Sequence, residues 1–160
     1  MQISGQTDIL VPPAHAIEAL QSRAHLERFL LGTSGLKETG PGQYSFAIQR
    51  RLAVITLNLP GTLSVTETAP GRVCHFEAKA AHLIGGSAQL ALDMTFDATP
   101  RGTHLTWIGT LDSSGLARQV LREKESRIGD VVAQIMAEFK MRVQTEARLA
   151  AIVVKPANRG

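Results

Sequence analysis

The side chains able to carry out acid–base or metal chemistry are few and widely spaced. The chain contains five histidines and a single cysteine, Cys74. His75 and Glu77 are two residues apart, and His15 and Glu18 are three apart, so each pair can meet on one face of a strand or helix. We interpret both as solvent-exposed charge pairs rather than catalytic dyads. No three of these groups share the spacing of a metal site or a nucleophile triad, so we expect no metal and no catalytic residue.

The other histidines and the cysteine fit structural roles. His104 is expected opposite Asp97 on the outer face of a sheet, as an ion pair. His25 and His82 lie near helix or loop ends, where a histidine can serve as a polar handle at the mouth of a cavity. Cys74 is predicted to point inward and to behave as a small apolar residue rather than as a reactive thiol.

Motifs of the common enzyme classes are missing. The sequence has no Gly-x-Gly-x-x-Gly, P-loop, His-Glu-x-x-His or Gly-x-Ser-x-Gly pattern. Residues 85–88 are glycine-rich but precede a strand, so we interpret them as a bulge or a close backbone approach. Aromatic residues make up only 4%, and the 17 basic residues are scattered among 14 acidic ones. Neither feature favours nucleic acid as a partner.

Composition and length indicate one ordinary globular domain. The 160 residues are 44% hydrophobic and 19% charged, which suits a packed core without disulfides. No apolar run reaches the ~18 residues of a membrane span, so no transmembrane anchor is expected. The N-terminus lacks the pattern of a signal peptide, and we therefore expect a cytoplasmic protein that needs no cofactor.

The elements that position these residues can be read from periodicity and turn chemistry. Residues 2–11 alternate as a half-buried strand, and Pro13 opens a short helix that is followed by another over residues 22–31. Residues 36–112 contain short strands of period two separated by turns that contain proline and glycine. The turns imply an antiparallel meander in which apolar residues face each other. The predicted pairs are Leu36–Phe46, Val65–Phe76, Leu63–Ala78, Phe96–Leu105, Met94–Trp107 and Leu90–Leu111.

A long C-terminal helix is predicted next, capped at its start by Ser113 and Ser114. Its apolar residues recur every three or four positions, and some 30 residues of helix would span ~45 Å. A curved sheet with one dry face needs a cover, and this helix supplies it. We therefore predict an α+β helix-grip fold, with an antiparallel sheet of six to seven strands wrapped around the C-terminal helix and two short helices after the first strand.

With this element order, the sequence resembles the START-like superfamily, also called SRPBCC, the polyketide cyclase and lipid-transfer group. Within it the chain is similar to the carbon monoxide dehydrogenase G family. The likeness is carried by the strand before Pro13, the hairpin of residues 36–44, the strand of residues 86–92 and the segment 103–117. It implies a single START-like domain over residues 1–150 and a short tail over residues 151–160. It also implies an accessory protein of a carbon monoxide dehydrogenase-type molybdenum hydroxylase.

The superfamily's shared trait is an apolar cavity, and the leading hypothesis is a non-enzymatic protein that binds a lipid or quinone-like molecule there. The expected cavity lies between the sheet and the C-terminal helix. Its predicted wall consists of Phe46, Ile48, Val65, Phe76, Leu90, Leu92, Trp107, Ile135 and Phe139. Two alternatives stay open. One is a polyketide cyclase or aromatase-like enzyme, and the other is a protein–protein adaptor with a collapsed cavity.

Overall fold

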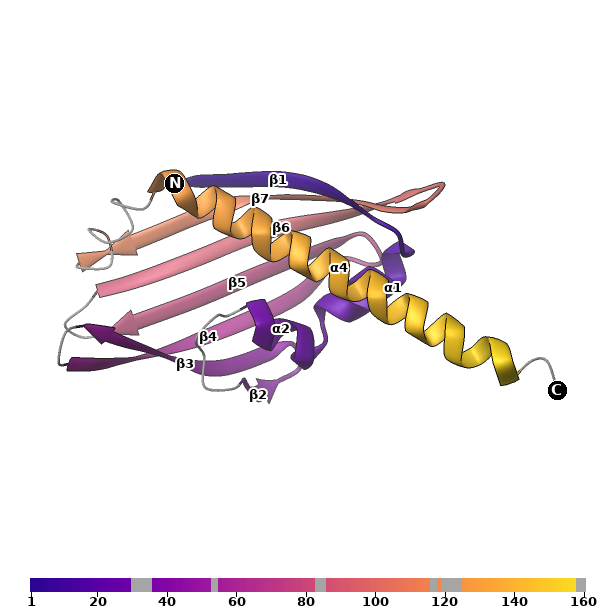
Figure 1. Cartoon of the computed structure of the whole chain (residues 1–160). Coiled ribbons are helices and arrows are strands. Elements are labelled where there is room, and N and C mark those ends of the chain that lie inside the picture. The colour runs from indigo at the N-terminus through magenta and orange to yellow at the C-terminus, as the bar shows by residue number, and fades with distance from the viewer. Residues whose placement is uncertain (30–35, 53–54, 83–85, 116–117, 119–124, 158–160) are drawn as a thin grey trace.

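The structure is a computed structural model that describes the chain except for residues 30–35, 53–54, 83–85, 116–117, 119–124 and 158–160. One strand and two short helices are followed by six strands and a long helix (Figure 1). The elements are β1 (Gln2–Ile9), α1 (Pro13–Leu20), α2 (Arg23–Phe29), β2 (Lys37–Gly40), β3 (Gln43–Leu52), β4 (Ile55–Ala69), β5 (Val73–His82), β6 (Gly86–Thr99), β7 (Gly102–Ser114) and α4 (Glu125–Ala157).

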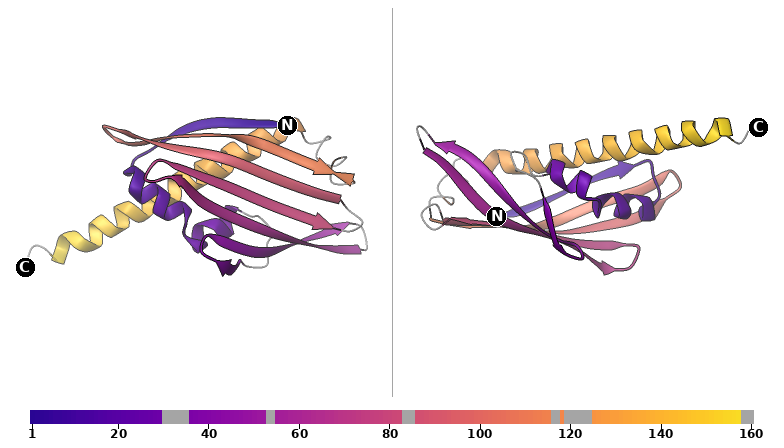
Figure 2. Two further views of the ribbon diagram at one scale, coloured as in Figure 1. Left: turned by 180° about the vertical axis from the view of Figure 1, so that it is seen from behind. Right: turned by 90° about the horizontal axis from the view of Figure 1, so that it is seen from below.

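All of these strands join one antiparallel sheet. The sheet has seven strands in the order β1-β7-β6-β5-β4-β3-β2, so β2 to β7 form a meander and β1 adds to the edge of β7. The helices lie on one face of the curved sheet, which α4 crosses obliquely, and the C-terminal part of α4 projects beyond it (Figures 1 and 2). This arrangement confirms the predicted α+β helix-grip fold.

The predicted strand register is confirmed around the β4–β5 and β6–β7 turns. Val65 pairs with Phe76 and Leu63 with Ala78. Around the last turn the pairs are Phe96–Leu105, Met94–Trp107 and Leu90–Leu111. β2 begins at Lys37, opposite Ser45, and this register brings Leu36 beside Phe46 as expected. The period-two pattern succeeds because one face of each strand is buried and a one-residue slip would expose it.

The core forms on the helix side of the sheet. It joins alternate residues of the strands to the apolar stripe of α4 and to α1. Phe96, Leu105 and Phe139 are at most 1% exposed. Cys74 is also fully buried, on the inner face of β5, as predicted.

The predicted start of the long helix falls at the end of β7. Ser113 and Ser114 belong to β7, where they pair with Ala88 and Ser87 on β6. Gly115, directly after them, is helical, but residues 116–117 and 119–124 lie outside the described ones, so capping by these serines stays a prediction. Gly86 sits opposite this end of β7 with a φ of 83°, and a Cβ there would overlap the carbonyl of Ser114. The close backbone approach expected in this glycine-rich segment is therefore present.

Helix boundaries differ elsewhere as well. α2 spans Arg23–Phe29, and the predicted end of this helix at residues 30–32 lies outside the described residues. α4 continues to Ala157, so most of the predicted tail over residues 151–160 is helical. Within the described chain, no helix is long and apolar enough to cross a membrane.

Candidate ligand-binding cavity

A small apolar cavity lies between the sheet and the helices. Its volume is about 60 Å³. It is lined by Leu20, Phe76, Ala78, Leu90, Leu92, Met94, Val132, Ile135 and Met136. Every one of these side chains is apolar, so the cavity offers contact area and no hydrogen bonds from these side chains.

The floor of the cavity comes from two paired strands. On β5, Phe76 and Ala78 point to the same face, and their partners on β6 are Leu92 and Leu90. Met94 follows Leu92 on that face, because successive side chains of a strand alternate. The floor is therefore a direct product of the period-two pattern of β5 and β6.

The roof of the cavity comes from helices. Val132, Ile135 and Met136 are spaced by three and four residues on α4, which places them on one side of the helix. Leu20, fully buried at the end of α1, closes the remaining side. Residues from four elements thus meet around the same small volume.

Only some of the predicted wall residues line the cavity in the structure. Phe76, Leu90, Leu92 and Ile135 line the cavity. Phe46, Val65, Trp107 and Phe139 are buried in the surrounding core and do not line it, and the side chain of Ile48 lies outside the described ones. The lining residues that the prediction missed are Leu20, Ala78, Met94, Val132 and Met136. Ala78 and Met94 could have been predicted, because each lies two residues from a predicted wall residue on the same strand and therefore faces the same side of the sheet.

Trp107 fills the core beside β1. It is 3% exposed and pairs with Gly5, and a Cβ on Gly5 would overlap the indole ring. The indole therefore occupies the space that the missing side chain of Gly5 leaves. Its Nε1 is buried without a hydrogen-bond partner among the described groups. The Trp107 side chain thus contributes packing, together with one unpaired donor.

His25 is the buried histidine of the described residues. It is 5% exposed, and its Nε2 lies 3.0 Å from Oε2 of Glu146 on α4. Its ring meets the ring of Phe139 edge-on, with centroids 5.8 Å apart. Nδ1 is buried and has no hydrogen-bond partner in the part of the chain that the structure describes. The sequence placed His25 near a helix end, but the packing of α4 is what encloses it.

His15, His75 and His104 lie on the outside, and the side chain of His82, predicted near the mouth of a cavity, lies outside the described ones. His75 Nε2 lies 3.6 Å from Glu77, the predicted pair, and His75 Nδ1 lies 2.8 Å from Asp93 on β6. A hydrogen bond from Lys79 is the main cause that lowers the pKa of Glu77. These contacts form a charge network on the outer face of the sheet.

The predicted ion pair of His104 is corrected. His104 does face Asp97 across the β6–β7 hairpin, but its Nδ1 lies 2.8 Å from Asp8 on β1. Asp97 instead pairs with Arg72, at 3.1 Å. The prediction used the hairpin alone, whereas β1 joins the edge of β7 from the far end of the chain.

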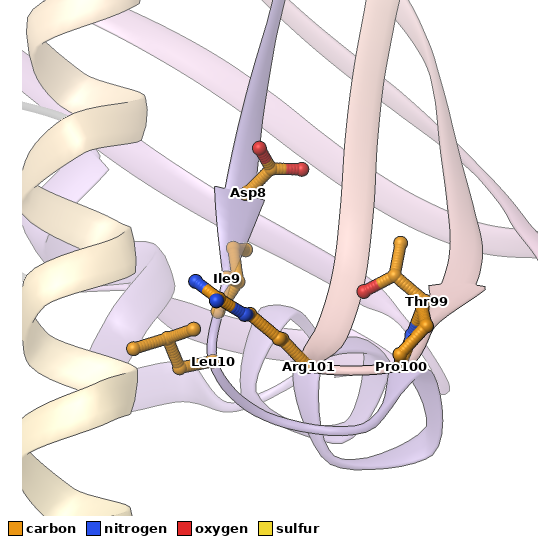
Figure 3. A pocket seen from close by; sticks show the side chains of 6 residues that line it. All are labelled: Asp8, Ile9, Leu10, Thr99, Pro100 and Arg101. Carbon is orange, nitrogen blue, oxygen red and sulfur yellow. The ribbon is translucent and has the colours of Figure 1, made fainter.

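A second hollow opens at the end of the sheet where β1 leads to α1. Its volume is about 380 Å³, and it is lined by Asp8, Ile9, Leu10, Thr99, Pro100 and Arg101 (Figure 3). Leu10 and Arg101 are exposed, and the carboxylate of Asp8 contacts His104. This hollow is larger than the apolar cavity, but it is a surface feature without a converging set of reactive groups. We therefore place the candidate site under α4.

The described metal-ligating and thiol groups are dispersed or buried. No group of three His, Cys, Asp or Glu side chains is arranged there to hold an ion. Burial raises the pKa of the Cys74 thiol to about 11, which keeps it protonated at neutral pH. The chemistry of the described interior is therefore that of apolar contact, plus two unpaired ring nitrogens.

Solved structures with the same fold come from several bacteria. A conserved protein from Geobacillus kaustophilus superposes with a TM-score of 0.71 at 15% identity, over 91% of this chain and 94% of that one. A protein from Thermus thermophilus gives a TM-score of 0.62 at 10% identity, over 91% and 99%. The di-domain ARO/CYC BexL from the BE-7585A biosynthetic pathway gives 0.53 at 15%, over 88% of this chain and 48% of that chain.

These likenesses define the class of fold. The chain has the helix-grip fold, which these solved structures share. At such low identities the likeness concerns the fold alone. No protein-family model matches the chain, and no curated protein matches it. The narrower resemblance to the carbon monoxide dehydrogenase G family stays a prediction.

Proposed function

We propose that this protein binds an apolar small molecule, without transforming it, in the cavity under α4. The observation that carries the proposal is the wall of this cavity, where all nine lining residues are apolar. Apolar concave sites between elements are where proteins of many folds hold small molecules. Burying ~300 Å² of apolar ligand surface would yield roughly 7 kcal/mol before the costs of association.

The cavity must enlarge to accept such a ligand. Its volume of about 60 Å³ is far below the lower end of small-molecule sites, roughly 300 Å³. Met94 and Met136 line opposite sides of it, and methionine has three rotatable bonds that let it vacate or fill irregular space. We infer that both side chains move aside when the ligand enters.

The resemblance supports a more specific version of this proposal. A lipid or a quinone-like molecule would be the ligand, and the protein would act in the cytoplasm as an accessory of a carbon monoxide dehydrogenase-type molybdenum hydroxylase. A quinone is both apolar and redox-active, which suits the two parts of this idea.

A polyketide cyclase or aromatase-like activity is the second candidate. Two observations favour it: the fold likeness to the ARO/CYC BexL, and the contact of buried His25 with the carboxylate of Glu146. Catalysis of that kind needs an acid or base that touches the substrate. The lining of the cavity contains no such group among the described residues, so we rank this candidate second.

Native mass spectrometry tests the proposal directly. The purified protein would be analysed for a co-purifying molecule, then incubated with menadione, a small quinone, and with palmitate. We expect a bound species with at least one of them. In Ala78→Leu the added side chain fills the cavity, so uptake should fall at least tenfold. Ala81→Leu is the matched control, because Ala81 is exposed on the same strand.

The outcomes separate the candidates. Uptake that Ala78→Leu abolishes and Ala81→Leu retains would support the carrier. A bound molecule that emerges chemically changed would favour the enzyme. A clean unliganded mass with every probe would contradict the carrier and leave the adaptor with a collapsed cavity as the better explanation. Urea unfolding of both variants checks that the sheet is intact, since overpacking costs ~1–3 kcal/mol.

A further inference from the structure

The ring of His25 is held in one orientation by two contacts. Its Nε2 lies 3.0 Å from the carboxylate of Glu146, and the ring meets that of Phe139 at an interplanar angle of 85°. An ionised carboxylate only accepts hydrogen bonds, so Nε2 must carry the proton. In the neutral ring Nδ1 is then an acceptor with a free lone pair.

This lone pair is buried and meets no donor among the described residues. The His25 side chain is 6% exposed, whereas that of Glu146 is 54% exposed, so the carboxylate holds the solvent side of the ring. Nδ1 lies on the other side of the ring's Cε1, and no hydrogen bond from the described groups reaches it. Leaving a buried acceptor unsatisfied costs ~1–3 kcal/mol, and such a group is usually paired in a native state.

His25 is connected to the wall of the cavity through α4. Phe139, which its ring contacts, is three residues after Met136 on the same side of α4, and Met136 lines the cavity. Leu20, on the opposite wall, ends the helix that leads to α2. We infer that a ligand too large for the present cavity, extended along α4 from Met136 to Phe139, would come to the His25 ring.

We propose that Nδ1 of His25 is the polar recognition atom of the site and accepts a hydrogen bond from a hydroxyl group of the ligand. This inference rests on the proposed binding function and adds the ligand class, an apolar ring compound that carries a hydroxyl. Glu146 is a positioning residue, because it fixes the tautomer that leaves Nδ1 free to accept.

Three ring compounds of similar shape test the inference by isothermal titration calorimetry. 2-Naphthol has a hydroxyl donor, 2-methoxynaphthalene has an acceptor but no donor, and 2-methylnaphthalene has neither. We expect 2-naphthol to bind about tenfold more tightly than the other two, the effect of one satisfied buried hydrogen bond. Equal affinities for the three would overturn the inference and leave the binding function standing. Binding of none of them, in line with the clean mass described above, would overturn both.

Variants locate the effect. His25→Leu should bind all three compounds equally, whereas His15→Leu, the matched change at an exposed histidine of α1, should keep the preference for 2-naphthol. Glu146→Ala, at a half-exposed position that tolerates change, should reduce the preference severalfold, and Glu146→Gln should restore it because its amide oxygen still accepts from Nε2. If His25→Leu still preferred 2-naphthol, the inference would be overturned. It would also be overturned if neither Glu146→Ala nor Glu146→Gln changed this preference.

Discussion

Two buried polar side chains hold the short segment of backbone between β1 and α1. The hydroxyl of Thr103 donates to the carbonyl of Val11 at 2.7 Å, and the amide oxygen of Gln144 accepts from the N–H of Leu10 at 2.9 Å. Both side chains are at most 6% exposed. Because the segment is irregular, its backbone groups need partners that no sheet or helix supplies. Single side chains therefore fix where α1 begins.

Gly5 has no side chain, and this absence makes room for the indole of Trp107. The indole of Trp107 lies over its Cα, and a Cβ would overlap the ring. We predict that Gly5→Ala destabilises the protein by ~1–3 kcal/mol, the usual cost of forcing atoms into a packed core. Urea unfolding followed by the fluorescence of the single tryptophan would measure it.

Gly129 provides the matched control for this substitution. It is exposed on α4, and a Cβ there would meet nothing within 4 Å. Gly129→Ala should therefore stabilise the protein by ~0.5–1 kcal/mol, since alanine favours helix. If both changes had the same sign, the packing of Trp107 on Gly5 would not be the cause.

Cys74 gives a pH dependence with a definite sign. Burial, and then the charge of Glu67, raise the pKa of this thiol from 9.0 to about 11. The folded state therefore holds the proton more tightly than the unfolded state does. The stability from this group is complete below pH 9.0 and is lost as the pH rises through about 11.

The free energy of unfolding in urea, measured at neutral and at alkaline pH, tests this linkage. The wild type should lose up to about 2–3 kcal/mol more than Cys74→Ala over the same interval, because the variant lacks the titrating thiol. Cys74→Ala leaves a cavity and is less stable throughout, so only the change with pH is compared. Equal losses in both proteins would mean that the thiol is not responsible.

At the scale of elements, the sequence patterns predicted the structure correctly where the contacting residues are close in sequence. The pairing of Val65 with Phe76 follows from a turn and two alternating strands, and both are close in sequence. The predicted capping by Ser113 and Ser114 stays a prediction, because these serines end β7 and most of the residues up to 124 lie outside the described ones. The predicted partner of His104 was wrong, since its actual partner Asp8 belongs to the first strand, far away in the sequence.

The candidate site was only partly predictable for the same physical reason. Alternate residues of β5 and β6 face inward, and this pattern identifies Phe76 and Leu92. Whether a buried residue lines a cavity or fills the core, however, depends on how α4 lies across the sheet. Phe139 and Trp107 share the dry face with the cavity residues and yet fill the core. The burial of His25 likewise requires α4 and cannot be read from α2 alone.

Gln144 connects α4 to the end of β1. Replacing it by leucine would remove the acceptor for the N–H of Leu10 and leave that group unsatisfied. We predict that Gln144→Leu lowers the free energy of unfolding by ~1–3 kcal/mol. Gln134→Leu is the control on the same helix, because Gln134 is exposed, and it should change stability by less than ~0.5 kcal/mol. Equal effects would show that the hydrogen bond contributes nothing.

At the scale of the whole molecule, α4 has two parts. Its N-terminal part covers the sheet, and its C-terminal part projects beyond it (Figure 2). Val143 and Gln144 are buried, Ala147 is half-buried, and the described side chains that follow are exposed, including Leu149 at 57% and Ile152 at 63%. The contacts that stabilise the fold therefore end near Ala147.

This division predicts how the protein responds to truncation. Removing residues 151–160 deletes helix without deleting any described buried side chain, so the free energy of unfolding should change by less than ~0.5 kcal/mol. Removing residues 143–160 instead takes away Val143, the hydrogen bond of Gln144 and the contact between Glu146 and His25, and should prevent cooperative unfolding. Thermal denaturation by circular dichroism distinguishes the two. A large loss of stability in the shorter truncation would place the end of the domain beyond residue 150.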